Sequence, residues 1–175
     1  RSNFHPFFFL FKFKFFRAIF KNANFIVLKK SNEFGNFFVN LPKHMSFYLD
    51  DAGYEKNTFN YIKSLDKNLL LNKTFMDIGG NIGVYSLFLK KNYNSKIMIF
   101  EPDNNNLELL YKTLKKNKFN NFFIFPFAIS DKIAIKKMLI DDIMGSTGSI
   151  SDHRNVPQQR MKLNEFKNVI AVKLD

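Results

Sequence analysis

The chain has 175 residues, of which 24 are phenylalanine, and its Lys and Arg residues outnumber Asp and Glu by 27 to 15, a net charge of +12. It contains no cysteine, which excludes disulfide scaffolds, cysteine-based zinc sites and cysteine nucleophiles. Its three histidines lie far apart, so we expect no histidine-built metal site. No uncharged apolar run reaches the roughly 18 residues that a membrane-spanning helix needs.

The basic residues do not gather in one part of the chain. Paired lysines recur at intervals along the whole sequence, and only four arginines are present. A net charge of this size is compatible with contact to nucleic acid or to an anionic membrane. The even spread favours a solvated lysine-rich surface instead, so we do not expect a nucleic-acid partner.

Residues 4–28 form the most unusual segment, because residues 7–20 are almost entirely aromatic or aliphatic. The run is interrupted by Lys12, Lys14 and Arg17, which excludes an ordinary signal-peptide core. Part of it alternates as a strand does, whereas as a helix it would be apolar on nearly all sides. We expect a packing element, with contact to a membrane surface as the alternative.

The next stretch predicts a hairpin followed by a helix. Residues 34–41 have the composition of a strand that Pro42 ends, and residues 46–49 are expected to pair with it across a short polar turn. From Tyr54 onward the apolar residues fall at helical spacing, which predicts a helix that ends near Asn68.

From residue 74 the pattern becomes regular. Short buried strands alternate with amphipathic helices, the strands at 74–78, 96–100 and 122–128 and the helices at 82–91 and 105–117. This β-α-β-α-β order is the start of a doubly wound parallel sheet in the α/β class. Two further strand-like runs follow, at 133–140 and 169–174.

A glycine-rich loop joins the first of these strands to its helix and reads Asp77-Ile-Gly79-Gly80-Asn81-Ile-Gly83. Glycines at such a place let the backbone turn tightly and approach a ligand closely. The helix that follows offers free N–H groups to a carboxylate or phosphate. An acidic residue that opens the loop suits a ligand with an amino-acid group, so Asp77 is expected to face the charged end of S-adenosylmethionine.

The second acidic residue of interest is Glu101, at the end of the next strand. An acid at this place can accept hydrogen bonds from both hydroxyls of an adenosine ribose. The third strand ends near Ala128 and Ile129, where an adenine ring would rest against apolar side chains. A glycine loop alone is compatible with a tight turn that binds nothing, but the ordered strand, loop, helix and acid together predict a nucleoside site.

These segments resemble the motifs of FkbM-type methyltransferases. Residues 75–87 are similar to the first motif of that family, D-x-G-A-N-x-G, with Gly80 in place of the usual alanine. Residues 97–103 resemble its A-F-E-P segment, and residues 125–132 resemble its P-x-A-[LIV]-S-D segment. The resemblance extends over residues 34–175.

The resemblance implies a Rossmann-like class I methyltransferase that uses S-adenosylmethionine, most often for O-methylation of sugars, glycolipids, polysaccharides or macrolides. A later strand of the family, with the pattern K-[IV]-D-[VI]-E-G, is not found in the sequence, so we expect a doubly wound, mainly parallel sheet that is incomplete at the C-terminus. The cofactor-binding residues that it implies are Asp77, Gly79, Asn81, Gly83, Glu101, Pro102, Ala128 and Ile129. The general base is not identified, and the candidates by residue type are Glu55, Ser130, Asp131 and His153.

Three segments are therefore expected: a Phe- and Lys-rich appendage over residues 1–33, a hairpin and helix over 34–73, and the cofactor-binding half of the domain over 74–175. The favoured function is a cytoplasmic methyltransferase that acts on a carbohydrate or another small-molecule acceptor. One alternative is an RNA methyltransferase on the same scaffold. Another is an inactive truncated remnant, or a membrane-surface protein led by residues 4–28.

Overall fold

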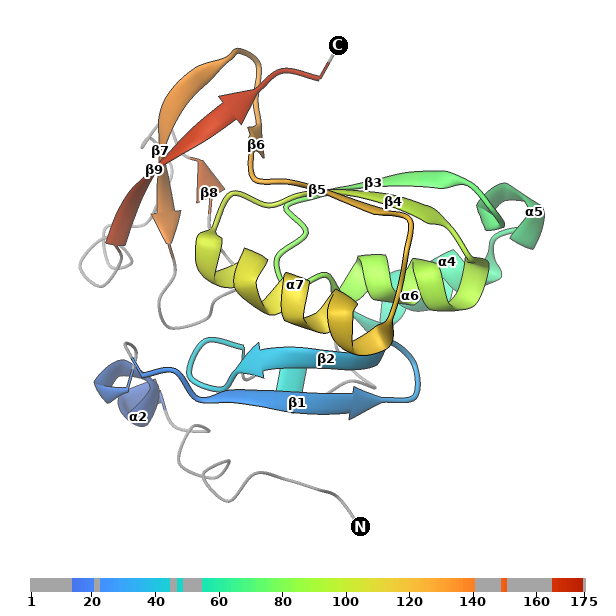
Figure 1. Cartoon of the computed structure of the whole chain (residues 1–175), viewed down its shortest axis with the longest axis horizontal. Coiled ribbons are helices and arrows are strands. Elements are labelled where there is room, and N and C mark those ends of the chain that lie inside the picture. The colour runs from blue at the N-terminus through green and yellow to red at the C-terminus, as the bar shows by residue number, and fades with distance from the viewer. Residues whose placement is uncertain are drawn as a thin grey trace.

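A computed structural model describes residues 14–20, 23–44, 47–48, 55–140, 149–150 and 165–174. These residues build a mixed α/β fold in layers (Figure 1). A three-stranded parallel sheet covers two long helices, and a β-hairpin lies on the other side of those helices. Within the described ranges, no helix has the length and apolar character needed to cross a membrane.

The parallel sheet has the strand order β3-β4-β5, with β3 (Thr74–Ile78), β4 (Lys96–Phe100) and β5 (Phe122–Phe125). Helix α6 (Val84–Tyr93) connects β3 to β4, and helix α7 (Asn104–Asn117) connects β4 to β5. Both helices lie on the same face of the sheet (Figure 1). The predicted β-α-β-α-β unit and the α/β class are therefore confirmed, with α6 shifted by two residues from its expected bounds.

The two faces of this sheet differ in what covers them. Ile97 and Ile99 point toward the helices and are completely buried in the main apolar core. Met76 and Ile78 lie on the opposite face and are 55% and 56% exposed. No helix covers that second face in the part of the chain that is described, so the second helix layer of a doubly wound sheet is not seen there (Figure 1).

The hairpin consists of β1 (Ile26–Ser31) and β2 (Gly35–Asn40), which pair antiparallel. The predicted strand at 34–41 is confirmed as β2, but its predicted partner is wrong, because Phe47 and Tyr48 are helical. The true partner precedes β2 in the chain. Residues 26–31, which are expected to belong to the appendage, therefore pair with the segment that follows them.

Hydrogen bonds from backbone N–H groups to side-chain oxygens fix the hairpin at its turn and along one edge. Ser31 Oγ accepts from the backbone N–H of Phe34 at 3.1 Å, which closes the turn. Along the free edge of β2, the backbone N–H of Phe38 donates to Thr113 Oγ1 at 2.9 Å, and that of Asn36 donates to Asn117 Oδ1 at 3.1 Å. Helix α7 thus takes the place of a third strand and blunts this edge.

The helix predicted to end near Asn68 is in fact two helices, α4 (Lys56–Ser64) and α5 (Lys67–Leu70). The break lies at Asp66, whose side chain accepts from the backbone N–H of Asn68 at 2.9 Å and so caps the second helix. An aspartate that can cap a new helix competes with continuation of the old one. The N-terminal residue of the predicted helix lies outside the described residues.

A second sheet has the order β6-β9-β7-β8, with β6 (Ala128–Ile129), β7 (Ala134–Ile140), β8 (Ser149–Ile150) and β9 (Glu165–Val172). Strand β6 is parallel to β9, and the other pairs are antiparallel. The predicted strand at 133–140 is confirmed as β7. The run predicted to begin at residue 169 is confirmed as β9, which begins four residues earlier.

The third predicted strand, at 122–128, is divided between the two sheets. Strand β5 ends at Phe125 because Pro126 has no backbone N–H to donate to a neighbouring strand. The chain then turns, and β6 joins the second sheet through β9. This change of sheet brings Ala128 and Ile129 to the carboxyl end of the first sheet, which is where the candidate site lies.

The described part of residues 4–28 contains helix α2 (Lys14–Ile19) and the start of β1. Phe20 and Phe25 pack against the main core and against each other, with ring centroids 6.0 Å apart. Phe15 is 69% exposed. The described residues therefore include both packed and exposed phenylalanines, and the predictions for residues 4–13 lie outside the described ranges.

Candidate nucleoside site

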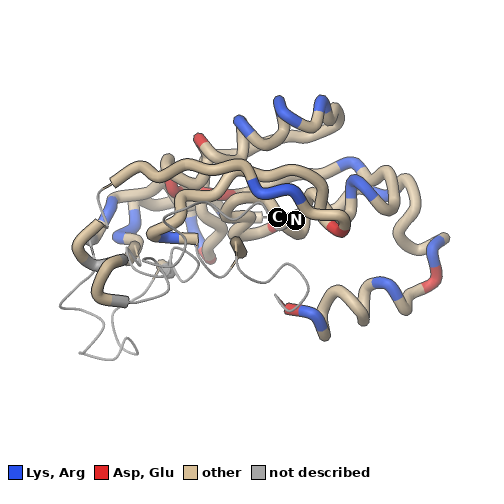
Figure 2. Tube along the Cα trace, turned by 90° about the horizontal axis from the view of Figure 1, so that it is seen from below, with Lys and Arg blue, Asp and Glu red and all other residues tan. Residues whose placement is uncertain are grey.

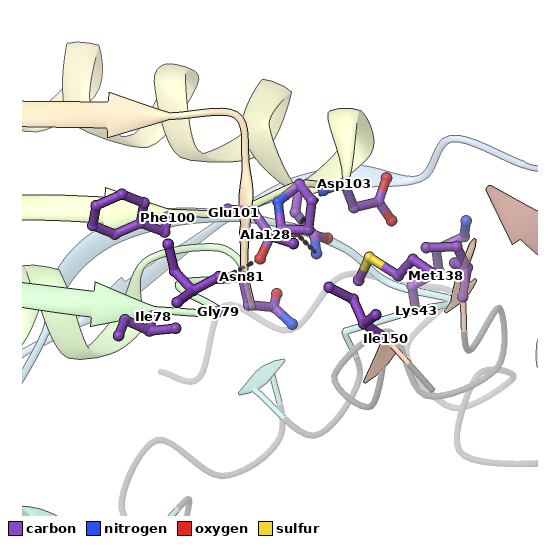
Figure 3. A pocket seen from close by; sticks show the side chains of 14 residues that line it. Lys43, Ile78, Gly79, Asn81, Phe100, Glu101, Asp103, Ala128, Met138 and Ile150 are labelled. Carbon is purple, nitrogen blue, oxygen red and sulfur yellow. Dashed lines mark hydrogen bonds between the residues drawn. The ribbon is translucent and has the colours of Figure 1, made fainter. Parts of the chain in front are cut away.

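A cavity of about 180 Å³ lies at the carboxyl end of the parallel sheet (Figure 3). In open α/β sheets this edge is where ligands bind, because the strand ends and helix N-termini meet there. The walls come from the ends of β3 and β4, from the first turn of α7 and from the second sheet. The lining residues are Lys43, Ile78, Gly79, Asn81, Phe100, Glu101, Pro102, Asp103, Asn106, Ala128, Ile129, Met138, Ile140 and Ile150.

The structure brings most of the predicted cofactor-binding residues to this one place. Those that line the cavity are Gly79, Asn81, Glu101, Pro102, Ala128 and Ile129. The other two predicted residues, Asp77 and Gly83, do not line it. Figure 3 shows Ile78 and Phe100 on one side of the cavity and Met138 and Ile150 on the other.

Asp77 points away from the cavity because it lies within β3, where side chains alternate between the two faces. Its neighbour Ile78 lines the cavity, whereas Asp77 Oδ2 accepts a hydrogen bond from Ser86 Oγ of helix α6. Burial raises the pKa of Asp77, and the hydrogen bond from Ser86 opposes that shift. Asp77 thus connects the sheet to the helix that follows the glycine loop.

The glycine loop is bound tightly between the sheet and the helices. A Cβ atom at Gly80 would clash with Cγ2 of Ile99, so glycine is the residue that fits at this position of the loop. Asn81 has a φ of 50°, a left-handed conformation that asparagine tolerates better than most residues. The loop thereby presents the backbone N–H of Asn81 toward the end of β4.

Glu101 is the centre of the site, and its side chain is only 3% exposed. Its Oε2 accepts from the backbone N–H of Asn81 at 2.8 Å, which ties the glycine loop to the end of β4. Its Oε1 accepts from the backbone N–H of Asp103 at 2.7 Å and from Asn106 Nδ2 at 3.4 Å. Burial raises the pKa of Glu101, and the two backbone N–H groups oppose that shift.

The hydrogen-bonding capacity of Glu101 limits what it can hold. An ionised carboxylate has about four lone-pair positions, and three are occupied by Asn81, Asp103 and Asn106. One position remains for a ligand hydroxyl. Acceptance from both hydroxyls of a ribose would require the long bond from Asn106 to give way.

Two polar residues of this site, Asn106 and His44, were not predicted from the sequence. Asn106 lies on the first turn of α7, five residues after Glu101, so its position in the chain could have suggested a contact. His44 lies 62 residues before Asn106, and its Nε2 is 3.3 Å from Asn106 Oδ1. Burial lowers the pKa of His44 to about 4, so the ring is neutral at pH 7.

The candidate bases do not line the cavity in the described part of the chain. Asp131 is exposed and accepts from Ser130 Oγ at 2.8 Å and from Lys136 Nζ at 3.0 Å, and these contacts lower its pKa to about 2. Such a weakly basic carboxylate is poorly matched to proton removal near pH 7. Glu55 is an exposed residue at the N-terminus of α4, and His153 lies outside the described ranges.

The charges of the described residues are distributed over several elements rather than gathered on one face (Figure 2). At the cavity, Lys167 Nζ lies 3.5 Å from Asp103 Oδ1. The described ranges contain no group of three or more His, Asp or Glu side chains that could hold a metal ion.

Comparisons with known proteins add no relative to this picture: no family model matches the chain, and no curated protein matches it significantly. The resemblance to FkbM-type methyltransferases therefore rests on the three sequence motifs. In the structure, the segments that carry them include the ends of β3, β4 and β5, side by side in the parallel sheet.

Proposed function

We propose that this chain binds S-adenosylmethionine in the cavity and has the Rossmann-like fold of a class I methyltransferase. The observation that supports this most strongly is the hydrogen bond from Asn81 N–H to Glu101 Oε2. It joins a glycine loop after one parallel strand to a buried acid after the next, beside a cavity at the carboxyl edge of the sheet. This is the arrangement that recognises a nucleoside in doubly wound folds.

The residues that line the cavity suit the nucleoside part of that ligand. Glu101 would accept a hydrogen bond from a ribose hydroxyl, and Ala128, Ile129 and Met138 would cover the faces of the adenine ring. The backbone at Gly79 would approach the methionine end. The cavity of about 180 Å³ is smaller than the roughly 300–1,000 Å³ of pockets for drug-sized ligands, so the described walls would enclose only part of the cofactor.

S-adenosylmethionine, when bound, supplies a methyl group on an electrophilic sulfonium. The contribution of this chain is then to orient the ligand and to exclude water, and Glu101 fixes the ribose so that the other groups keep a constant position. Ile78 and Phe100 supply apolar walls on one side of the cavity (Figure 3).

The acceptor class comes from the resemblance. FkbM-type enzymes mostly methylate hydroxyl oxygens, so we propose O-methylation of a sugar, glycolipid or polysaccharide in the cytoplasm. An alcohol acceptor loses its proton to a positioned base during such a transfer. In this proposal the base is not Asp131, because the hydrogen bonds from Ser130 and Lys136 lower the pKa of its carboxyl to about 2.

Isothermal titration calorimetry with S-adenosylmethionine and S-adenosylhomocysteine tests the proposal. We expect wild type to bind both with dissociation constants in the range of about 1 μM to 1 mM, and we expect Glu101→Ala to lose binding. Glu108→Ala is the control, because Glu108 is an exposed acid on α7 that pairs with Lys112. Wild type that binds neither ligand would overturn the proposed function.

A further inference from the structure

A chain of hydrogen bonds runs from the backbone of β2 to the carboxylate of Glu101. The backbone N–H of Asn40 donates to His44 Nδ1 at 3.2 Å. His44 Nε2 lies 3.3 Å from Asn106 Oδ1, and Asn106 Nδ2 donates to Glu101 Oε1 at 3.4 Å. None of Asn40, His44 and Asn106 is a predicted site residue.

The bond from the backbone N–H of Asn40 fixes the direction of the other bonds in the chain. A backbone N–H can only donate, so His44 Nδ1 must be the acceptor and carries no proton. In a neutral imidazole the proton then sits on Nε2, which donates to Asn106 Oδ1. In the opposite orientation of the Asn106 amide, its oxygen would face the Glu101 carboxylate, so that two acceptors would meet. Its NH₂ group would face the N–H of His44 Nε2, so that two donors would meet. The amide group of Asn106 is therefore held with its NH₂ toward Glu101.

The three side chains are shielded from water, which would otherwise compete for these bonds. His44 is 1% exposed, Asn106 is 8% exposed and Glu101 is 3% exposed. They come from three separate elements: the segment after β2, the first turn of α7 and the end of β4. The chain of bonds thus connects the hairpin to the cavity, which both Asn106 and Glu101 line.

We propose that His44 and Asn106 are positioning residues that hold the Glu101 carboxylate for a ribose hydroxyl, and that this chain of bonds makes the site prefer a nucleoside with an intact ribose. The inference rests on the proposed function, since it takes Glu101 as the ribose acceptor. With the bond from Asn106 in place, Oε1 accepts twice and Oε2 once, so one acceptor position on Oε2 is left for a ribose hydroxyl.

The test compares the affinity for adenosine with that for 2′,3′-dideoxyadenosine by calorimetry. The variants are Asn106→Leu, which removes the amide at similar size, and His44→Phe, which keeps a ring and removes both nitrogens. We expect each to weaken adenosine binding by roughly tenfold and to leave dideoxyadenosine binding unchanged. A purely structural role would weaken both ligands equally, and that result would overturn the inference.

Thr113→Val serves as the matched control. Thr113 is a buried residue of the same helix that holds the hairpin through Phe38, away from the cavity. We expect it to lower stability and to leave the preference for adenosine intact; loss of that preference in this variant would overturn the inference. If wild type binds neither nucleoside, both the inference and the proposed function are overturned. If Asn106→Leu and His44→Phe keep the wild-type preference for adenosine over dideoxyadenosine, only the inference is overturned.

A second measurement needs no variant and does not depend on a ligand. Long-range ¹H–¹⁵N NMR spectra of the full chain report which nitrogen of His44 carries the proton. We expect protonated Nε2 and unprotonated Nδ1, as the bond from Asn40 requires. Protonated Nδ1 would reverse the orientation of Asn106 and overturn the inference.

Discussion

The region around Asp77 and the region around Glu101 use the same type of side chain for different purposes. Both carboxyls have a pKa that burial raises. Asp77 accepts from Ser86 of helix α6 and does not line the cavity, whereas Glu101 accepts from two backbone N–H groups and lines the cavity. The difference arises because Asp77 is inside a strand and Glu101 is just past the end of one.

An acidic residue beside a glycine loop can thus face the helix layer, as Asp77 does, rather than the cavity. The alternation of side chains along β3 directs Asp77 to the helix layer, where its carboxyl accepts a hydrogen bond from Ser86. Substitutions in the Asp77 region should therefore reduce the free energy of unfolding. Substitutions of Glu101 should mainly reduce ligand affinity.

The largest expected effect is at Gly83, which belongs to the Asp77 region. Gly83 has a φ of 83°, and a Cβ there would lie 2.5 Å from Leu110 Cδ1 in α7. Gly83→Ala should lower the free energy of unfolding by about 2–5 kcal/mol, from the left-handed backbone and the overpacking together. Urea denaturation followed by circular dichroism measures this loss.

Gly79→Ala is the matched control for Gly83→Ala. Gly79 also has a positive φ, 77°, but a Cβ there would meet nothing within 4 Å. Only the backbone cost of about 1–2 kcal/mol should remain. Equal losses in the two variants would show that α7 does not pack against Gly83 as described.

The next effect is the pH dependence that His44 contributes in the Glu101 region. Its pKa falls from 6.5 to about 4 on folding because the ring is buried. Between these two pH values the unfolded chain binds more protons than the folded chain. The contribution of His44 to the free energy of unfolding therefore rises as the pH rises from 4 to 6.5, by about 3 kcal/mol in all.

Urea denaturation at several pH values checks this sign, with His44→Phe as the comparison. Between pH 4 and 6.5, the rise in the free energy of unfolding should be smaller in the variant than in wild type by about 3 kcal/mol. Asp77 should act in the opposite direction, because its raised pKa makes the folded state lose stability as the pH rises above 3.8. Identical pH profiles for wild type and His44→Phe would contradict the burial of His44.

A smaller effect is expected at Asp77 itself. Asp77→Ala leaves the buried Ser86 hydroxyl without its acceptor and should cost about 1–3 kcal/mol of unfolding free energy. Asp77→Asn keeps an acceptor of the same shape and should cost less. Met76→Thr is the control, because Met76 is the residue next to Asp77 and its side chain lies on the exposed face of the sheet. This substitution should change the free energy of unfolding by less than about 0.5 kcal/mol. A greater loss in Met76→Thr than in Asp77→Ala would reverse the assignment of the two faces.

Much of the parallel sheet could be predicted from the sequence because its signals are local. The strands at β3 and β4 are short apolar runs, and α7 has a clear amphipathic period, so their bounds agree with the structure to within one residue. The end of β5 was missed although Pro126 is visible in the sequence. A proline near the end of a strand does not by itself show that the chain continues into another sheet.

The parts that were not predicted depend on contacts between distant residues. The hairpin partner of β2 is Ile26–Ser31, which lies in the segment expected to be an appendage, and only its pairing with β2 reveals its place in the fold. The position of Asp77 toward Ser86 depends on which face of the sheet the helices cover. His44 comes to the site only because the segment after β2 packs beside α7, and no local pattern indicates that.

The most direct test of the account is the affinity for S-adenosylhomocysteine of two isosteric variants, Glu101→Gln and Asp77→Asn, measured by calorimetry beside wild type. Glu101→Gln removes the charge that accepts from the ligand, and we expect a loss of about 10–100-fold. Asp77→Asn changes a residue that does not line the cavity, and we expect a change of less than about threefold, or under 1 kcal/mol. An equal loss in both variants, or a greater loss in Asp77→Asn, would contradict the account.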